Sequence, residues 1–175
     1  NEFKELFKDE KNDKFYKTEE FQLETDFELL IPDDYVNNIA ERLSIYQSMD
    51  NLKNEGGLER YKLNLKDRFG ELPEETNELF ETIKLKWIAK EIGLEKIILK
   101  QNKMIGYFTT NQQSNYYETA NFTKVLDFIQ TNPRNCKMSE KNNKLRLIFS
   151  NINSISEALR SLKPLSISAE KQNQY

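Results

Sequence analysis

A short segment in the first half of the chain, residues 66–73, constrains the fold most, because it ends one helix and starts another. Gly70 fits the left-handed backbone position that commonly follows a helix. Pro73 suits the first turn of the next helix, where its missing N–H leaves no hydrogen bond unmade. We therefore expect two consecutive helices with a tight connection, one over residues 58–69 and one from Pro73 to Gly93.

Apolar periodicity predicts one strand and one further helix before this pair. The alternation over residues 21–31 indicates a half-buried strand. Pro32, Asp33 and Asp34 then interrupt the strand, and one aspartate is expected to cap the helix that follows. In this helix the apolar residues recur three and four positions apart, at Val36, Ile39, Ala40, Leu43, Tyr46 and Met49. A turn at residues 54–57 is expected before the next helix.

The second half of the chain changes to strand patterns. Two hairpins are predicted, one at 96–109 around Gln101-Asn102-Lys103 and one at 136–149 around Asn142-Asn143. Helical patterns occupy residues 120–130, with Phe122, Val125, Leu126 and Ile129 inward, and residues 153–162. The sequence thus predicts an α+β fold, in which N-terminal helices pack on a small, irregular, mostly antiparallel sheet that the strand at 21–31 joins.

The two ends of the chain are expected to lie outside this domain. Residues 1–7 read as a short amphipathic helix, and residues 8–20 as a connector rich in lysine and acidic residues. We assign 1–20 to a linker or arm, 21–165 to the domain and 166–175 to a frayed tail. Because Asn1 stands in what reads as the middle of a helix, we expect this chain to be a piece of a longer protein.

Composition excludes several classes of site. The chain has no His and one cysteine, Cys136, so zinc clusters, histidine bases and an internal disulfide are excluded. Its five glycines form no phosphate-binding loop. We expect no catalytic site, cofactor or metal here, and an inert thiol at Cys136. No apolar run approaches the roughly 18 residues of a membrane span, which favours the cytoplasm.

Charge argues against a nucleic-acid surface. The net charge is −3, and lysines, arginines and acids alternate along the sequence, whereas phosphate binding rests on clustered cations. A small basic helix patch of Lys84, Lys86 and Lys90 is offset by neighbouring glutamates. We therefore expect no direct contact with nucleic acid.

Two polar groups remain as candidate sites. Asp33 and Asp34 either cap a helix or, alternatively, hold a divalent metal in an enzyme. Asn64, Asp67 and Arg68 stand at positions i, i+3 and i+4 of one helix and share a polar stripe. This stripe is either a solvated face or a docking surface, on which Asp67 and Arg68 meet complementary charges of a partner.

Three ordered motifs resemble the C-terminal domain of bacterial transcription-repair coupling factors, and the resemblance covers residues 27–165. The first motif opens the domain, the second lies in its first helix and the third is the segment discussed first: Leu30-Ile31-Pro32-Asp33-Asp34-Tyr35-Val36, Arg42-Leu43-Ser44-Ile45-Tyr46 and Leu65-Lys66-Asp67-Arg68-Phe69-Gly70-Glu71-Leu72-Pro73. Pro32, Asp33, Asp34, Phe69, Gly70 and Pro73 are its structural residues. The family usually has Glu where this chain has Asn64, so one charge of the docking face is missing.

The resemblance implies a regulatory role without hydrolysis. Such factors are ATP-driven and Mg-dependent DNA translocases that displace stalled RNA polymerase and recruit excision repair. Their C-terminal domain is implied to dock on an N-terminal module similar to the excision nuclease's B subunit, hiding the surface that recruits the A subunit. Residues 1–20 would then be the arm from the preceding translocase region. The alternative is an accessory domain of the same translocase that contacts nucleic acid.

Overall fold

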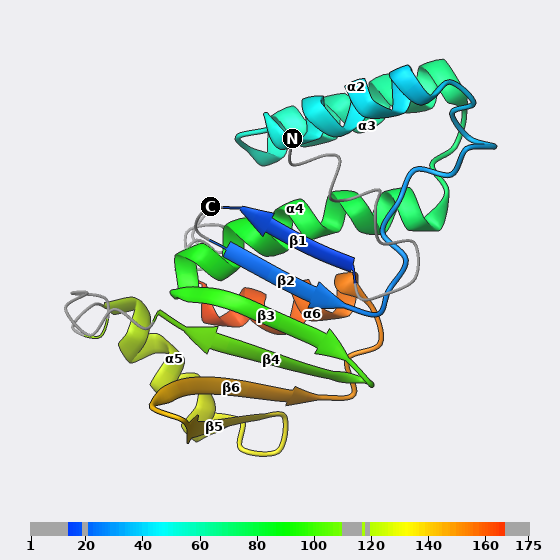
Figure 1. Cartoon of the computed structure of the whole chain (residues 1–175). Coiled ribbons are helices and arrows are strands. Elements are labelled where there is room, and N and C mark those ends of the chain that lie inside the picture. The colour runs from blue at the N-terminus through cyan, green and yellow to red at the C-terminus, as the bar shows by residue number, and fades with distance from the viewer. Residues whose placement is uncertain (1–13, 19–20, 110–116, 118–119, 167–175) are drawn as a thin grey trace.

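The computed structural model describes residues 14–18, 21–109, 117 and 120–166. Six strands form one sheet in the order β1-β2-β3-β4-β6-β5 (Figure 1). The strands are β1 (Lys14–Thr18), β2 (Phe21–Thr25), β3 (Leu94–Lys100), β4 (Lys103–Phe108), β5 (Cys136–Lys141) and β6 (Lys144–Ser150). The helices are α2 (Ile39–Asp50), α3 (Glu55–Phe69), α4 (Glu74–Ile92), α5 (Ala120–Thr131) and α6 (Ile155–Leu162), followed by the 3₁₀ turn η2 (Lys163–Leu165).

The sheet is mostly antiparallel, and the predicted α+β class is confirmed. Only β2 and β3 run parallel, and the remaining neighbours pair antiparallel. β1 lies in the segment that the sequence suggested as a linker, so that expectation is wrong for Lys14–Thr18. The expected helix at 1–7, the rest of the arm and residues 167–175 of the expected tail lie outside the described residues. The expectation of a frayed tail is wrong for its first residue, Ser166, which is 2% exposed and whose hydroxyl donates to a carboxylate oxygen of Glu91 at 2.8 Å.

Both predicted hairpins are present, and their turns explain why they form. Gln101 and Asn102 have φ values of 51° and 60°, and Asn142 and Asn143 have 53° and 62°. Two consecutive residues with positive φ give the two-residue turn whose twist matches that of the flanking strands. Asparagine tolerates this conformation better than most residues do. The turn residues therefore fix the register of β3 with β4 and of β5 with β6.

The described residues form two apolar clusters, and α4 contributes to both. The first cluster fills the space between one face of the sheet and α4, α5 and α6, which lie behind the sheet in Figure 1. The second cluster joins α2, α3 and the first half of α4, away from the sheet. Of the three N-terminal helices, α4 therefore packs on the sheet, while α2 and α3 pack on α4.

Several local predictions need correction. The predicted strand at 21–31 ends at Thr25. Asn38, not Asp33 or Asp34, caps α2, because its side chain accepts a hydrogen bond from the Glu41 N–H. On α2 the side chain of Ile39 is 61% exposed rather than inward, and Ala40 is exposed as well.

Four further boundaries or conformations also differ. The expected turn at 54–57 is the start of α3, which Asn54 caps. Pro73 is the N-cap of α4 rather than a residue of its first turn. Gly70 has the positive φ that the sequence indicated, 91°, but its ψ of −170° lies outside the left-handed helical region. On α5, Leu126 is 37% exposed rather than inward.

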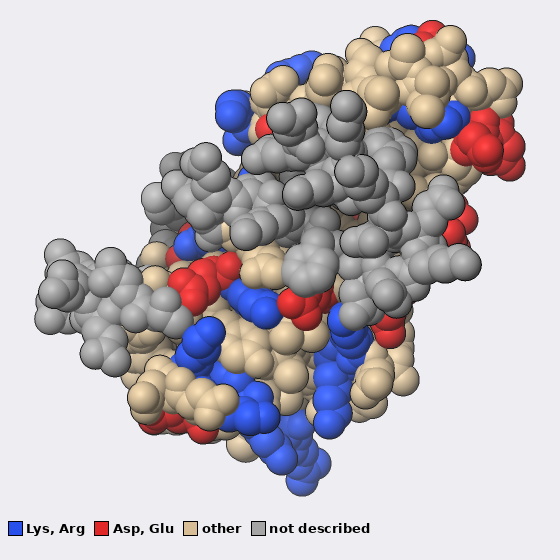
Figure 2. Space-filling view, viewed as in Figure 1, with Lys and Arg blue, Asp and Glu red and all other residues tan. Residues whose placement is uncertain are grey.

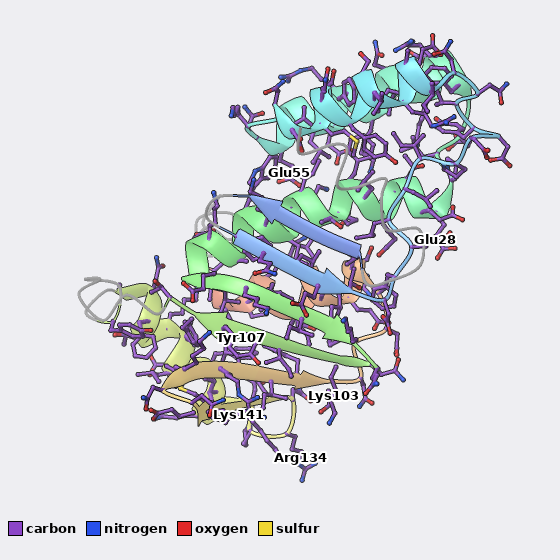
Figure 3. All side chains as sticks on the ribbon, in the orientation of Figure 1. Glu28, Glu55, Lys103, Tyr107, Arg134 and Lys141 are labelled. Atoms are coloured by element: carbon purple, nitrogen blue, oxygen red, sulfur yellow. The ribbon has the colours of Figure 1, made fainter. Side chains whose placement is uncertain are left out.

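The opposite face of the sheet has no described helix on it. Register places Lys96, Tyr107, Arg146 and Ser139 side by side across β3, β4, β6 and β5 on this face. Ile98, Ile105, Ile148 and Lys137 form the next row. Lysine and arginine side chains gather over these strands in Figure 2. Figure 3 labels three residues of the strands: Lys103, Tyr107 and Lys141. Among the described helices, none has the length and apolar composition that a membrane span requires.

Candidate docking surface

The first and third sequence motifs meet at the end of α3. The Tyr35 ring packs edge-on against Phe69, with ring centroids 5.8 Å apart. The Tyr35 hydroxyl donates to the carbonyl oxygen of Gly70 at 2.8 Å and lies 3.4 Å from that of Leu65. Gly70 follows the last residue of α3, so its carbonyl has no partner within the helix, and the Tyr35 hydroxyl supplies one. Tyr35 thus contacts both the last residue of α3 and the glycine that follows it.

The structure brings the predicted polar stripe together on the surface. Asn64, Asp67 and Arg68 lie on the last turns of α3, and all three are exposed. The buried residues of the helix are Leu58 and Leu65, on its other side. Within the described part of the chain, Asp67 has no ion pair or hydrogen-bonding side chain. Its carboxylate is therefore available to a cation from outside.

Arg68 is held by a residue that sequence reasoning missed. A guanidinium nitrogen of Arg68 lies 3.8 Å from a carboxylate oxygen of Glu41 on α2, and both side chains are about half exposed, at 48% and 49%. The Arg68 guanidinium also lies 4.7 Å from the centre of the Phe69 ring. An exposed ion pair of this kind contributes roughly 0–1 kcal/mol to stability. It places an acidic group from α2 beside Arg68.

Leu63 adds an apolar element to this surface. It is 60% exposed and is one of three large apolar side chains that the described residues expose, together with Ile39 and Leu126. Leu63 precedes Asp67 by four positions, so the two lie on one face of α3. In the sequence, Leu63 falls outside the apolar stripe that the helix buries, and this could have indicated its exposure. Leu63, Asn64, Asp67, Arg68 and Glu41 are called the α3 surface below.

Asp33 and Asp34 lie elsewhere and have a structural setting. Both are exposed in a turn in which the Tyr35 and Val36 N–H groups donate to the Pro32 carbonyl oxygen at 3.1 Å. In the ranges that the structure describes, no group of three or more Cys, Asp or Glu side chains is arranged to hold a metal ion. Asp33 and Asp34 thus gain no third acidic ligand from that part of the chain.

The small basic patch on α4 is neutralised at its first member. The Lys84 ammonium lies 3.1 Å from Glu59, 3.5 Å from Glu81 and 3.6 Å from Glu55. Burial alone would lower the pKa of Lys84, but the hydrogen bond to Glu59 and the three negative charges together raise it. The residue joins α3 to α4 and stays protonated. Its charge is thus engaged by carboxylates of α3 and α4.

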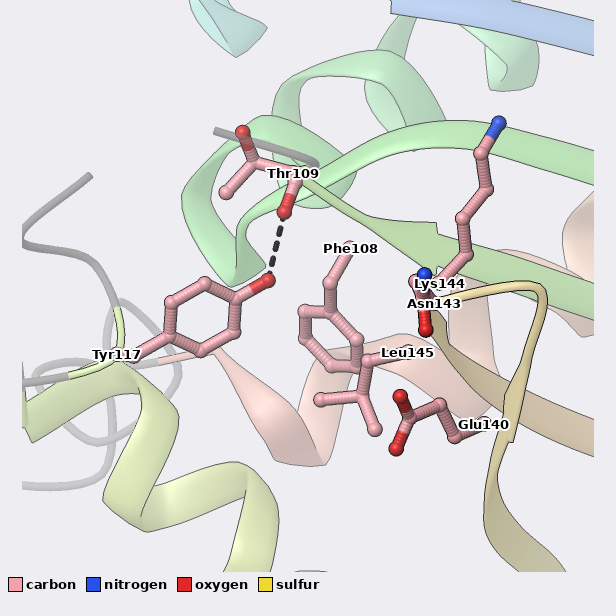
Figure 4. A pocket seen from close by; sticks show the side chains of 7 residues that line it. All are labelled: Phe108, Thr109, Tyr117, Glu140, Asn143, Lys144 and Leu145. Atoms are coloured by element: carbon pink, nitrogen blue, oxygen red, sulfur yellow. Dashed lines mark hydrogen bonds between the residues drawn. The ribbon is translucent and has the colours of Figure 1, made fainter. Parts of the chain in front are cut away.

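A pocket of about 240 Å³ lies at the other end of the molecule, lined by Phe108, Thr109, Tyr117, Glu140, Asn143, Lys144 and Leu145 (Figure 4). The Tyr117 hydroxyl donates to the Thr109 carbonyl oxygen at 2.6 Å, and the Lys144 side chain points away from Glu140. The lining residues offer no nucleophile with an adjacent base, which is the arrangement that covalent catalysis needs.

Cys136 is buried in the core of the domain. Its side chain is 1% exposed, within the sheet-side cluster. Burial raises the pKa of the thiol to about 11. Because the thiolate is the reactive form, this environment favours the inert state expected for it.

The chain resembles known proteins over most of its length. The model of the TRCF domain family matches residues 25–119, more than half of the 175 residues. The transcription-repair-coupling factor of Rickettsia bellii is 30% identical over 122 residues, which are 69% of this chain and 10% of that protein. That of Buchnera aphidicola subsp. Acyrthosiphon pisum is 32% identical over 144 residues, 79% of this chain and 17% of that protein. The chain thus spans a small part of these relatives' length.

A solved structure shares the fold. The crystal structure of the C-terminal domain of transcription-repair coupling factor superposes with a TM-score of 0.68 at 19% identity, covering 87% of this chain and 94% of that one. The likeness in fold therefore covers more of the chain than the residues that the family model matches.

Proposed function

The chain belongs to the TRCF domain family of transcription-repair coupling factors, and from this we propose that it is a non-catalytic, autoinhibitory interaction domain. Its partner is the N-terminal module of the same protein, similar to the excision nuclease's B subunit. Docking hides the surface of that module which recruits the A subunit. Engagement of stalled RNA polymerase by the parent protein, an ATP-dependent DNA translocase of the bacterial cytoplasm that uses Mg and ATP, releases the contact.

The observation that carries this proposal is the composition of the α3 surface. Asp67 is exposed without a partner in the described part of the chain, and Leu63 exposes an apolar side chain one turn before it. An interface gains most from a few desolvated contacts, such as an apolar anchor and a charge that finds its counter-ion. The complementary surface would therefore present a cation to Asp67 and an apolar recess to Leu63.

Glu41 compensates in part for the missing family glutamate at position 64. In the family pattern that glutamate stands one turn before the arginine, where it can pair with it. Here Asn64 cannot supply the charge, but the Glu41 carboxylate lies 3.8 Å from Arg68. The acidic neighbour of Arg68 thus comes from α2 instead of α3. Asn64 contributes a neutral hydrogen bond to the partner in this arrangement.

Release follows from two-state behaviour. A contact worth a few kcal/mol keeps most molecules closed, and a ligand opens them only to the extent that it binds the open state more tightly. The α3 surface suits such a contact, because its charged groups are exposed and lose little when the contact opens.

The test is calorimetric titration of this chain into the separately expressed N-terminal module. We expect binding that the double variant Asp67→Ala/Arg68→Ala weakens by about 1–3 kcal/mol. Asp127→Ala/Arg160→Ala is the matched control, since it removes one exposed acid and one exposed arginine from α5 and α6. Glu41→Gln should weaken binding less than the double variant and more than the control. Equal affinities for wild type, double variant and control would refute docking through α3.

A second experiment, with a fusion protein, detects the contact even when the separate module and chain bind weakly. The module and the chain are joined by a flexible linker, which raises their effective concentration. Hydrogen exchange at the end of α3 should then be slower in the fusion than in the free chain, and the double variant should remove the difference. Identical exchange in both molecules would reject the intramolecular contact.

A further inference from the structure

The face of the sheet opposite the helices carries a concentration of positive charge. Five basic residues stand at outward positions of β4, β5 and β6: Lys103, Lys137, Lys141, Lys144 and Arg146. On β3, Lys96 and Lys100 face the same way and share Glu24 of β2, at 3.1 and 4.0 Å. Glu140, the acid of β5, has Leu145 as its register partner and so belongs to the opposite, helix-covered side. The outward positions of β3, β4, β5 and β6 are called the open face below.

The alternation of side chains along each strand places the basic residues on the open face and the neighbouring residues on the opposite face. Successive residues of a strand point to opposite faces, so Lys141 and Glu140 diverge although they are neighbours in sequence. The chain as a whole has a net charge of −3. Its acids are therefore concentrated elsewhere, and Figure 2 shows lysine and arginine gathered over the lower strands. The expectation of no nucleic-acid contact assumed that the two signs stay mixed in space.

The centre of the open face is apolar and aromatic. Ile98, Ile105 and Ile148 lie side by side on three neighbouring strands, and all are half-buried. Tyr107 lies in the next row between Lys96 and Arg146, and it is labelled in Figure 3. The Arg146 guanidinium is oriented by two hydrogen bonds to the Ser139 hydroxyl oxygen, at 2.9 and 3.1 Å.

We propose that the open face binds a single nucleic-acid strand, with phosphates on the surrounding lysines and a base against Tyr107. Single strands are held by a positive groove or surface together with aromatic rings on which bases stack. The isoleucine row offers an apolar floor next to that ring. A lipid layer fits the surface less well, because Ile39, Leu63 and Leu126, the large apolar side chains exposed in the described residues, all lie on helices. This site is independent of the α3 surface.

The experiment measures binding of fluorescently labelled 20-nucleotide single-stranded DNA to the 175-residue chain by anisotropy, over a series of salt concentrations. The test variant is Lys103→Glu/Lys137→Glu/Lys144→Glu, which reverses three exposed lysines of the open face. The control is Lys53→Glu/Arg160→Glu/Lys163→Glu, which makes the same change in net charge at exposed positions away from the sheet. Circular dichroism and the thermal midpoint verify that each variant is folded.

We expect the open-face variant to lose at least tenfold in affinity, and the control to change by less than threefold. The slope of log Kobs against log salt concentration should also become shallower, by about 0.7 for each phosphate of the single strand that the variant no longer neutralises. Loss of affinity that is equal in both variants would show that net charge alone is responsible and would overturn the proposal. Absence of binding by the wild-type chain at low salt would overturn it as well.

Two further binding experiments identify the class of ligand. Tyr107→Ala should weaken single-stranded DNA or RNA severalfold more than a blunt duplex, whose bases are not free to stack. Tighter binding of the duplex, with no effect of Tyr107→Ala, would overturn the assignment to a single strand. Poly-glutamate at equal charge concentration should compete poorly. Equal competition would mean that the open face recognises an acidic protein segment rather than nucleic acid.

Discussion

The Glu78 carboxylate of α4 accepts a hydrogen bond of 2.8 Å from the backbone N–H of Ile155, the first residue of α6, which lies 77 positions later in the chain. Its second oxygen accepts a bond of 2.6 Å from the Ser156 hydroxyl. A negative charge at a helix N-terminus satisfies free N–H groups and interacts favourably with the helix dipole. Glu78 therefore fixes where α6 begins relative to α4, in addition to the local cap by Ser154.

Replacement of Glu78 tests this long-range cap. We expect Glu78→Ala to lower the free energy of unfolding by about 1–3 kcal/mol, because two donors at the start of α6 lose a charged acceptor. Glu28→Ala, which removes an exposed acid from the segment before α2, should change it by less than about 0.5 kcal/mol. Urea unfolding followed by circular dichroism measures both, and equal midpoints for the two variants would contradict the role given to Glu78.

The Tyr35 hydroxyl provides a second test, at the end of α3. Tyr35→Phe keeps the edge-on contact with Phe69 but removes the donor to Gly70. The expected cost is about 1 kcal/mol, since one carbonyl at the end of the helix is left without its donor. Tyr107→Phe is the control, because this hydroxyl lies on the open face of the sheet. If both substitutions cost the same in thermal unfolding, the Tyr35 hydroxyl does not stabilise the motif.

Packing disfavours a larger residue at Gly106 in the middle of β4. A Cβ atom added there would lie 2.8 Å from Leu94 Cδ1, on the neighbouring strand. Gly106→Ala should therefore destabilise the domain by about 1–3 kcal/mol through overpacking. Leu94→Val should recover part of this loss in the Gly106→Ala background while costing stability by itself. Additive effects in that double-mutant cycle would indicate that the two side chains do not compete for space.

The Cys136 thiol predicts a dependence of stability on alkaline pH. The pKa is about 11 in the folded chain and 9.0 for the unperturbed group. Well below pH 9 both states keep the proton and the contribution is constant. Between pH 9 and 11 the unfolded state loses its proton first, so stability falls as pH rises.

The size of that loss follows from the shift. Two pKa units correspond to roughly 2.7 kcal/mol, which is an upper figure for this thiol. Urea unfolding of wild type and Cys136→Ala from pH 8 to pH 11 isolates it, because the tyrosines titrate in both proteins. The stability of the wild type should decrease more steeply with pH than that of the variant. Parallel curves would contradict a buried, protonated thiol.

Much of the fold could be predicted from the sequence where local signals decide the structure. The Asn142-Asn143 turn and the positive φ of Gly70 depend on the residues themselves. The strand predicted at 21–31 is too long because Phe27, Leu29 and Ile31 continue the alternation of β2. In the structure they are instead packed against the two apolar clusters beyond the end of the strand. Periodicity reports burial, and it does not tell what covers the buried side.

For the candidate surfaces too, the sequence predicted what local geometry decides and missed what packing decides. Spacing on one helix was enough to place Asn64, Asp67 and Arg68 together, since helix geometry is local. Glu41 could not be found in this way, because its position beside Arg68 depends on how α2 packs on α3. The open face of the sheet was hidden for a related reason. Its lysines alternate with residues of the other face, so the charges look mixed until the strands are paired.

The membership of α4 in both apolar clusters has a consequence for how the domain opens. The helix has 19 residues and is about 28 Å long. Its early residues Leu79 and Phe80 belong to the cluster with α2 and α3, and Leu85 and Ala89 to the cluster against the sheet. If either apolar cluster came apart, the side of α4 that packs in that cluster would be exposed to water. A partner that pulls on α3 would therefore also pull on α4, and through α4 on the sheet.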